Sequence, residues 1–191
     1  MMETLQAWDE ALLLALNATP HWMHSLAWIL TSKWATLPVA IWILWTLFSR
    51  TTPVRSWLGL AMFLCTVAGT DAISSRLMKP GFARPRPSHA SQLEGQLVLH
   101  ENPNGTLYRG GPFGMVSSHA ANTFGLATLA VLLFGSTRWR WLWVWAGTVS
   151  WTRIYLGVHY PADIALGALF GAGWAIAIHT AFQRFTSVNR P

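Results

Sequence analysis

The chain has 191 residues, of which 52% are hydrophobic and only 10% are charged, and it contains 13 tryptophans. A soluble domain carries about 25% charged residues, so this composition excludes a soluble globular protein and a disordered chain. The formal net charge of +6 comes from basic residues scattered between apolar runs, unlike the clustered basic face of a nucleic-acid-binding protein. Cys65 is the only cysteine, which excludes an internal disulfide and a cysteine-based metal cluster. We therefore predict an all-α integral membrane protein, with residues 1–191 forming a single domain.

The N-terminal residues 5–16 contain an apolar run next to Asp9 and Glu10. A membrane-spanning helix needs about 17–25 predominantly apolar residues, so this segment is too short and too acidic to span. The pattern is typical of an amphipathic helix on the membrane surface, and we expect residues 1–18 to form such an interfacial helix. No basic residue precedes Lys33, which disfavours a cleavable signal peptide.

Five later segments are apolar enough to predict a bundle of about five transmembrane helices. The third is short, so we expect its polar start to lie at the membrane surface. Asp71 and Arg76 in the second segment, and Arg153 near the end of the fourth, are unusual because charged side chains inside a membrane are costly and normally functional. The predicted spans are residues 26–48, 57–77, 120–134, 139–156 and 162–182.

Basic residues mark one side of this bundle as cytoplasmic by the positive-inside rule. The segment 79–117 and the turn 157–161 then face outward, from the inner (cytoplasmic) membrane toward the periplasm or exterior. A loop as long as 79–117 is usually functional or disordered. Within it, residues 88–108 have few apolar anchors and include the turn-prone 102–105. The basic residues on the cytoplasmic side are Arg50, Arg55, Arg138, Arg140, Arg184 and Arg190.

Two polar clusters flank the outward segment. The first holds Lys79, Arg84 and Arg86, which attraction to anionic lipid headgroups would explain on its own. In the second, Ser117 is a plausible helix N-cap, so that His119 lies in the first turn of the third span. Backbone N–H groups and the helix dipole favour a phosphate at that position, although capping and packing alone would also explain these residues.

A third polar cluster lies at the turn between the last two spans. Gly157 ends the fourth span, and Pro161 suits the first turn of the fifth. His159 and Asp163 are four residues apart, so the carboxylate can hydrogen-bond one imidazole nitrogen and raise the basicity of the other. A structural His–Asp pair that caps a helix would give the same pattern.

The predicted topology brings all three clusters to one outer surface. Three cations and the helix N-termini suit a doubly charged phosphate, while two histidines, one with a carboxylate partner, supply a nucleophile and a proton donor. This conjunction predicts a site for phosphate chemistry. Its members are Lys79, Arg86, Ser117, His119, Arg153, His159 and Asp163.

These clusters, in this order, resemble the type 2 phosphatidic acid phosphatase family, which contains membrane lipid phosphatases and soluble vanadate haloperoxidases. The family pattern is K-x(6)-R-P, then P-S-G-H, then S-R-x(5)-H-x(3)-D. Lys79 and Arg86 fit the first motif, which selects Arg86 over Arg84. Ser117 and His119 fit the second motif.

The third motif is matched by Arg153, His159 and Asp163. Three positions depart from the pattern, and two of them, Val116 and Thr152, stand at positions that perform no chemistry in the family. The serine in place of the family's glycine costs some backbone freedom, but its N–H remains a donor, so we expect an active enzyme. The departing residues are Val116 for proline, Ser118 for glycine and Thr152 for serine.

The resemblance implies a reaction that needs no metal and no cofactor. His159 would attack phosphorus to form a phosphohistidine while Asp163 orients it. His119 would protonate the leaving oxygen and then activate water. The phosphate oxygens would be bound by Lys79, Arg86, Arg153, Ser117 and the Ser118 N–H.

The resemblance also implies a membrane lipid phosphate as the substrate, taken from the lipid bilayer. We expect undecaprenyl diphosphate, with lipid A and phosphatidylglycerophosphate as alternatives. A small transporter that uses Lys33, Asp71 and Arg76 is another alternative, although neither repeats nor discontinuous helices are visible in the sequence. No nucleic acid partner is expected, and the sequence leaves the oligomeric state open.

Overall fold

The computed structural model describes residues 2–18 and 22–188, so Arg190 lies outside the described residues. This part of the chain is helical, with two isolated β-bridges in its loops, which confirms the all-α class. Short helical turns lie at Ser74–Met78 (a π-helix), Pro87–His89, Ser91–Leu93 and Thr137–Arg140. The α-helices are α1 (Met2–Asn17), α2 (Trp22–Leu30), α3 (Lys33–Arg50), α4 (Pro53–Ile73), α5 (Lys79–Phe82), α6 (Ser118–Phe134), α7 (Trp141–Tyr155) and α8 (Pro161–Val188).

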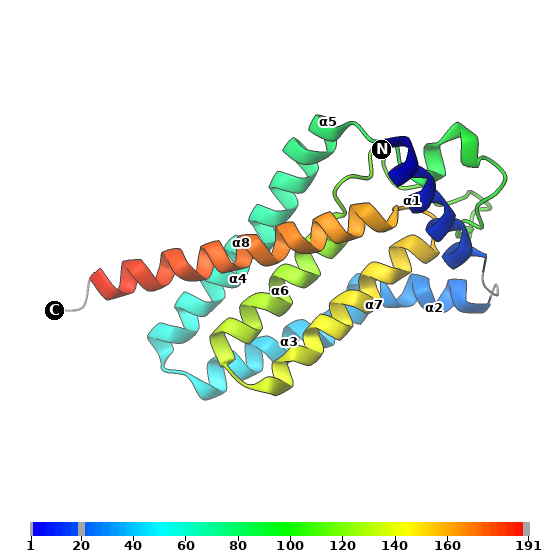
Figure 1. Cartoon of the computed structure of the whole chain (residues 1–191). Helices are drawn as coiled ribbons and strands as arrows, with labels where there is room; N and C mark the ends of the chain where they lie inside the picture. The colour runs from blue at the N-terminus through cyan, green and yellow to red at the C-terminus, as the bar shows by residue number, and fades with distance from the viewer. Residues whose placement is uncertain (1, 19–21, 189–191) are drawn as a thin grey trace.

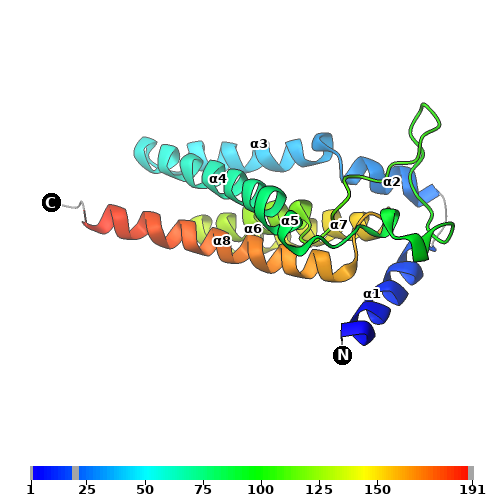
Figure 2. The ribbon, with the colours of Figure 1, turned by 90° about the horizontal axis from the view of Figure 1, so that it is seen from above.

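Helices α3, α4, α6, α7 and α8 run alongside one another and form an elongated bundle (Figure 1). The α3–α4 turn, the α6–α7 connection and the end of α8 point toward one end of this bundle. Helices α1 and α2 and the loop after α5 gather at the other end (Figure 2). The segments that the sequence analysis assigns to the outer side therefore share one end, and the orientation of that end in the membrane stays a prediction.

The number of membrane spans also stays a prediction. By length and composition, two helical stretches of the described chain can cross a bilayer: Pro53–Phe82, with 30 residues, and Pro161–Phe185, with 25. A third candidate is a bent pair, Met23–Leu30 and Lys33–Arg50, whose helices meet at 42°. Helices α6 and α7 have 17 and 15 residues, at or just below the length of a typical span, although both lie within the bundle.

The predicted span 26–48 is therefore not one straight helix. The side chain of Ser32 accepts a hydrogen bond from the Ala35 N–H at 3.4 Å and caps a new helix that begins at Lys33. An N-cap serine satisfies backbone donors that have no partner within the helix, which stabilises a helix start at this point. The break brings Thr31 to Arg153, which donates a hydrogen bond to its hydroxyl.

The second span is longer than the predicted 57–77. It continues through one π-helical turn, Ser74–Met78, into α5, which begins at Lys79. A π-turn inserts an extra residue into the helix, and such turns are frequent at functional sites. This continuous helical stretch, Pro53–Phe82, is followed by Ala83, whose left-handed φ of 46° redirects the chain toward the start of α6 and α8.

Among the described helices, α6 and α8 share the most extensive contact, and small residues line it. A Cβ atom on Gly171 would lie 2.0 Å from the carbonyl oxygen of Ala121, and one on Gly167 would lie 2.6 Å from that of Ser117. Small residues let helix backbones approach in this way. The contact fixes the starts of both helices side by side, and these starts carry the second and third polar clusters.

The helix predicted near the N-terminus is present as α1, which packs against α7 and α8. Its Leu13 is fully buried, and Asn17 donates to the carbonyl oxygens of Tyr155 at 2.7 Å and Val98 at 2.9 Å. The helix therefore ties the outward loop to the end of α7. Its position relative to the membrane surface stays a prediction.

Candidate active site

The turn between α7 and α8 carries a histidine–aspartate pair. Gly157 follows α7 with a φ of +69°, and Pro161 begins α8, as the sequence predicts. His159 Nδ1 lies 3.2 Å from Asp163 Oδ2, which also accepts a hydrogen bond from the Tyr160 N–H at 3.1 Å. Because Nδ1 faces the carboxylate, Nε2 is the nitrogen that is left for a reaction.

His159 is buried among cations and is only 1% exposed. Burial, and after it the charges of Arg86, Arg153 and Lys79, holds the pKa of His159 well below its ordinary value. The imidazole is therefore neutral at neutral pH. A neutral ring retains the lone pair that a nucleophile needs.

The start of α6 lies directly against this pair. Ser117 is the N-cap, as predicted: its side chain accepts a hydrogen bond from the Ala120 N–H, and its own N–H donates to the Asp163 carbonyl oxygen at 3.0 Å. His119 follows in the first turn, where it is half-buried and lines two cavities. The first turn of α6 therefore brings His119 and the positive end of a helix dipole to the side of the turn that holds His159.

Lys79 and Arg86 approach from the chain that precedes the loop. Lys79 Nζ donates to the hydroxyl of Ser118 at 2.9 Å. Arg86 is buried, and it donates to two backbone carbonyl oxygens, those of Phe113 at 3.1 Å and Val158 at 3.4 Å. The serine that replaces the family's glycine thus positions a lysine, a role that the sequence analysis missed because it considered only the backbone of this residue.

Arg153, in the last turn of α7, is 2% exposed. Its two terminal nitrogens donate to the hydroxyls of Thr31 and Tyr108, each at 3.1 Å. Among the described residues, its Nε has no hydrogen-bond partner. A buried donor without a partner costs free energy, which a ligand oxygen would recover.

No carboxylate neutralises Lys79, Arg86 or Arg153 within residues 2–18 and 22–188, where Arg84 forms ion pairs with Asp9 and Asp163 and the neutral His159 hydrogen-bonds Asp163. Burial, and after it the charge of Arg153, lowers the pKa of Arg86 from its usual value. Like charges held together in a buried place are costly unless an anion joins them. The cluster is therefore suited to a group with more than one negative charge, such as a phosphate.

Arg84 has a different position from Arg86. Its Nη1 lies 3.1 Å from Asp163 Oδ1 and its Nη2 lies 2.6 Å from Asp9 Oδ2. Two carboxylates thus pair with its guanidinium, which distinguishes Arg84 from Arg86. The sequence analysis gave Arg84 no role, and no local signal indicated one, because both partners are at least 75 residues away in the chain.

Two cavities open next to His119. A groove of about 430 Å³ between α3, α4 and α6 is mainly apolar, and Lys33, Asp71 and Ser118 also line it. Lys33 and Asp71, two of the three charged residues that suggested a transporter, thus line a groove next to the candidate site. The second cavity, of about 340 Å³, is lined by Trp28, Thr31, Ser32, Lys33, Trp34, Tyr108, His119 and Arg153.

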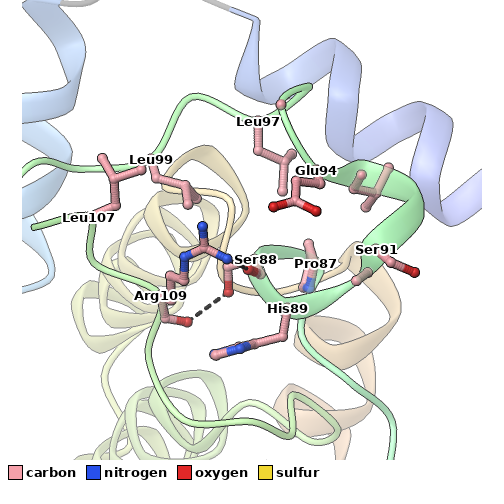
Figure 3. Close-up of a pocket in the computed structure, with 12 residues that line it drawn as sticks. Pro87, Ser88, His89, Ser91, Glu94, Leu97, Leu99, Leu107 and Arg109 are labelled. Carbon is pink, nitrogen blue, oxygen red and sulfur yellow. Dashed lines mark hydrogen bonds between the residues drawn. The ribbon is translucent and has the colours of Figure 1, made fainter.

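The outer loop, residues 88–108, folds over this end of the bundle around a third cavity of about 230 Å³ (Figure 3). Ser88 donates to the Arg109 carbonyl oxygen at 2.7 Å, and the expected turn forms where the Gly105 N–H donates to Asn102 at 2.9 Å. Among the few apolar anchors of this loop, Leu93 is 3% exposed and packs with Leu13, Ile154 and Tyr160.

Within the residues that the structure describes, no three His, Cys, Asp or Glu side chains lie where they could together hold a metal ion. That the reaction needs no metal or cofactor stays a prediction.

Comparisons with known proteins agree with this geometry. The family model of the PAP2 superfamily matches residues 56–187. A lipid A 4′-phosphatase of Bacteroides thetaiotaomicron is 35% identical over 180 residues, which cover 91% of this chain and 77% of that protein. A lipid A 4′-phosphatase of Porphyromonas gingivalis is 30% identical over 173 residues, covering 89% and 71%.

Two solved structures share the fold. The PAP2-type phosphatidylglycerolphosphate phosphatase of Bacillus subtilis superposes with a TM-score of 0.68 and 22% identity, over 95% of this chain and 87% of that one. Aquifex aeolicus LpxE superposes with a TM-score of 0.59 and 22% identity, over 89% and 93%. None of these relatives supports the expected substrate, undecaprenyl diphosphate, and two of them carry the name of the alternative, lipid A.

Proposed function

Because the chain belongs to the PAP2 superfamily and is a membrane-bound phosphatase that acts on lipids, we propose that its substrate is lipid A, from which it removes the 4′-phosphate. The observation that carries this proposal is that both curated relatives have this activity in their names and align with about nine tenths of the chain. We further propose that the enzyme lies in the inner membrane, with the active site toward the periplasm. Undecaprenyl diphosphate becomes the competing substrate in the test.

The proposed reaction has two steps. The bound phosphate offsets the charges of Arg153, Arg86 and Lys79, which otherwise disfavour a protonated His119, so that His119 carries a proton in the enzyme–substrate complex. His159 Nε2 attacks phosphorus, the bond from phosphorus to the lipid oxygen breaks, and His119 gives this proton to the leaving oxygen. His119 then takes a proton from water, whose oxygen attacks phosphorus and releases inorganic phosphate and free His159. Asp163 keeps Nδ1 hydrogen-bonded and stabilises the charge that develops on the ring.

The phosphate-binding groups in this proposal are the three cations that have no carboxylate partner in the described part of the chain, together with the start of α6. Negative charge on the phosphoryl oxygens develops where these groups already point, so little reorganisation is needed in the transition state. The proposed ligands are Lys79, Arg86, Arg153, Ser117 and the backbone N–H of Ser118.

Two cavities support a substrate that combines sugar and acyl chains. The groove between α3, α4 and α6 is mainly apolar and suits an acyl chain that leaves the bilayer. The neighbouring cavity presents Trp28, Trp34 and Tyr108 beside Arg153. Aromatic faces with polar groups at their edge suit a phosphorylated sugar, which has apolar C–H faces and many hydroxyls.

The proposal is tested with purified protein in detergent, with EDTA present, on lipid A, undecaprenyl diphosphate and phosphatidylglycerophosphate. We expect the highest kcat/KM with lipid A, and mass spectrometry with fragmentation should locate the remaining phosphate at position 1. His159→Ala serves as the control for contaminating phosphatases. A preference for undecaprenyl diphosphate of about tenfold, which corresponds to about 1.4 kcal/mol, would contradict the proposed substrate.

The proposed orientation is tested separately by cysteine labelling in intact cells. In a Cys65→Ala background, Ser91→Cys in the outer loop should react with an impermeant maleimide, whereas Ser136→Cys, between α6 and α7, should not. Both serines are exposed, so burial does not bias the comparison. The reverse pattern would place the site in the cytoplasm.

A further inference from the structure

Asp163 has a second charged partner besides His159. Its Oδ2 faces His159 and the Tyr160 N–H, while its Oδ1 accepts a hydrogen bond from Arg84 Nη1 at 3.1 Å. The Asp163 side chain is fully buried, so every oxygen that lacked a partner there would be costly. The guanidinium of Arg84 also lies over the ring of Tyr160, 3.9 Å from its centroid, which restricts its orientation.

Arg84 is itself held from α1. Asp9 Oδ2 accepts from Arg84 Nη2 at 2.6 Å, and Asp9 Oδ1 accepts from the Ala162 N–H at 2.9 Å. One carboxylate from the N-terminal helix therefore satisfies a free backbone donor at the start of α8 and fixes the arginine beside it. Asp9 is 9% exposed, so water competes little for either bond.

We propose that Arg84 is a positioning residue for Asp163, and that Asp9 holds Arg84 in place, so that α1 supports the active site. The inference rests on the proposed role of His159. The chain Asp9–Arg84–Asp163–His159 is continuous in hydrogen bonds and links α1 to the nucleophile. Outer partners that orient a reacting group in this way typically contribute 10- to 100-fold, roughly, at metal-bound histidines, and we expect a similar magnitude here.

The forked guanidinium explains why this position needs arginine. A single planar group must reach two carboxylates at the same time, and arginine presents separate nitrogens to each. A lysine would supply the charge through one ammonium group, without the fork. Arg84→Lys should therefore recover part of the function that Arg84→Ala loses.

The experiment measures kcat and KM for p-nitrophenyl phosphate and lipid A with purified Arg84→Ala, Arg84→Lys and Asp9→Asn. For Arg84→Ala we expect kcat to fall by about 10- to 100-fold with KM changed by less than about threefold, because the phosphate ligands remain. On a logarithmic scale, Arg84→Lys should restore at least about a third of the kcat that Arg84→Ala loses. Asp9→Asn should lower kcat by about threefold.

Arg109→Ala is the matched control, because Arg109 also anchors the loop, through the Ser88 carbonyl oxygen at 3.1 Å, without contacting the site. Its kcat should stay within about twofold of the wild type, as for a surface substitution. Equal losses in Arg84→Ala and Arg109→Ala, or a loss confined to KM, would overturn the inference in favour of general loop damage.

A double-mutant cycle separates positioning from structure. If Arg84 acts through Asp163, adding Arg84→Ala to Asp163→Asn should change kcat by less than about twofold, whereas independent effects would multiply. If the fold-losses in kcat of the two single variants multiply in the double variant, the inference is overturned. If the rate of Asp163→Asn is below detection, the inference is decided by whether Arg84→Ala lowers kcat without changing KM and by whether Arg84→Lys restores kcat. His159→Ala is measured in parallel: an active His159→Ala contradicts the proposed mechanism, whereas an inactive one beside a fully active Arg84→Ala contradicts only this inference.

Discussion

The starts of α6 and α8 and the outer loop lie at the same end of the bundle but are held in different ways. Backbones that nearly touch at Gly171 and Ala121 fix the helix starts, and His159 and Asp163 are buried between them. The outer loop is mostly exposed and rests on a few contacts, such as buried Leu93. Rigid helix ends suit chemistry that requires fixed distances, whereas an exposed loop can vary without disturbing them.

This difference predicts two classes of variants. Changes at the helix ends should reduce the reaction with every substrate, while changes at the exposed parts of the loop should alter the choice among lipids. Binding energy from remote parts of a substrate can be lost without damage to the reacting groups. Variants in the two regions therefore test whether catalysis and substrate selection are separable in this molecule.

The largest effect is expected at the proposed nucleophile. His159→Ala should lower kcat by at least about 1,000-fold with all substrates, because the proposed phosphoenzyme forms on His159. Size-exclusion chromatography in detergent should show that the variant remains folded. Retention of a tenth of the wild-type activity would exclude His159 as the nucleophile.

A large effect on stability is expected where α6 and α8 meet. Gly171→Ala adds a Cβ atom 2.0 Å from the Ala121 carbonyl oxygen, so the helices must separate, at a cost of about 1–3 kcal/mol or more. Thermal unfolding in detergent should shift to lower temperature, and activity should fall with both lipid and soluble substrates.

The matched control for this variant is Gly173→Ala, on the same helix. A Cβ atom there meets nothing within 4 Å, and alanine is the better helix former by about 1 kcal/mol. Its unfolding temperature should be unchanged or higher. Equal losses in the two variants would show that close packing of α6 on α8 does not hold the site together.

A smaller, selective effect is expected at the tip of the outer loop. Replacing residues 102–105 by Gly-Gly removes an exposed turn and leaves the buried Leu93 anchor intact. We expect kcat/KM for lipid A to fall several-fold, about 3- to 10-fold, with p-nitrophenyl phosphate unaffected. Parallel losses with both substrates would indicate that the loop is structural, and unchanged values would assign substrate choice to the grooves beside α3.

The smallest effect is expected for Ser118→Gly, which restores the residue typical of the family. The variant removes the hydroxyl that accepts from Lys79 Nζ but keeps the backbone N–H. The buried hydroxyl also hydrogen-bonds the hydroxyls of Ser74 at 2.8 Å and Ser75 at 3.4 Å, so the variant loses three hydrogen bonds, of which one holds Lys79. Loss of the hydrogen bond to the charged Lys79 should raise KM by about two- to threefold. A decrease in kcat of more than about tenfold would mean that the hydroxyl takes part in the transition state.

Features that depend on neighbouring residues could be predicted from the sequence. The cap at Ser117, the turn at Gly157 and the pairing of His159 with Asp163 all follow from short spacings. The gathering of distant cations could be predicted only through the family resemblance and the alternation of spans, because each cation alone has a simpler explanation.

Other features could not be predicted because their causes are tertiary. The bend between α2 and α3 needs only a capping serine, Ser32, within an apolar run, and the π-turn before Lys79 has no distinct sequence signal. The link from Asp9 to Arg84 joins residues 75 positions apart. Asp9 therefore contributed to the sequence analysis only as an acidic residue that disfavoured a span.

Identification of the phosphorylated residue tests the central claim most directly. His119→Ala should slow the second step, because the proposed mechanism uses His119 to activate water, whereas p-nitrophenolate leaves without a proton donor. Incubation of this variant with p-nitrophenyl phosphate, followed by alkaline denaturation and peptide mass spectrometry, should therefore detect a phosphoryl group on His159 and a matching burst of p-nitrophenolate. Phosphate on another residue, or turnover without any phosphoenzyme, would contradict the proposed mechanism.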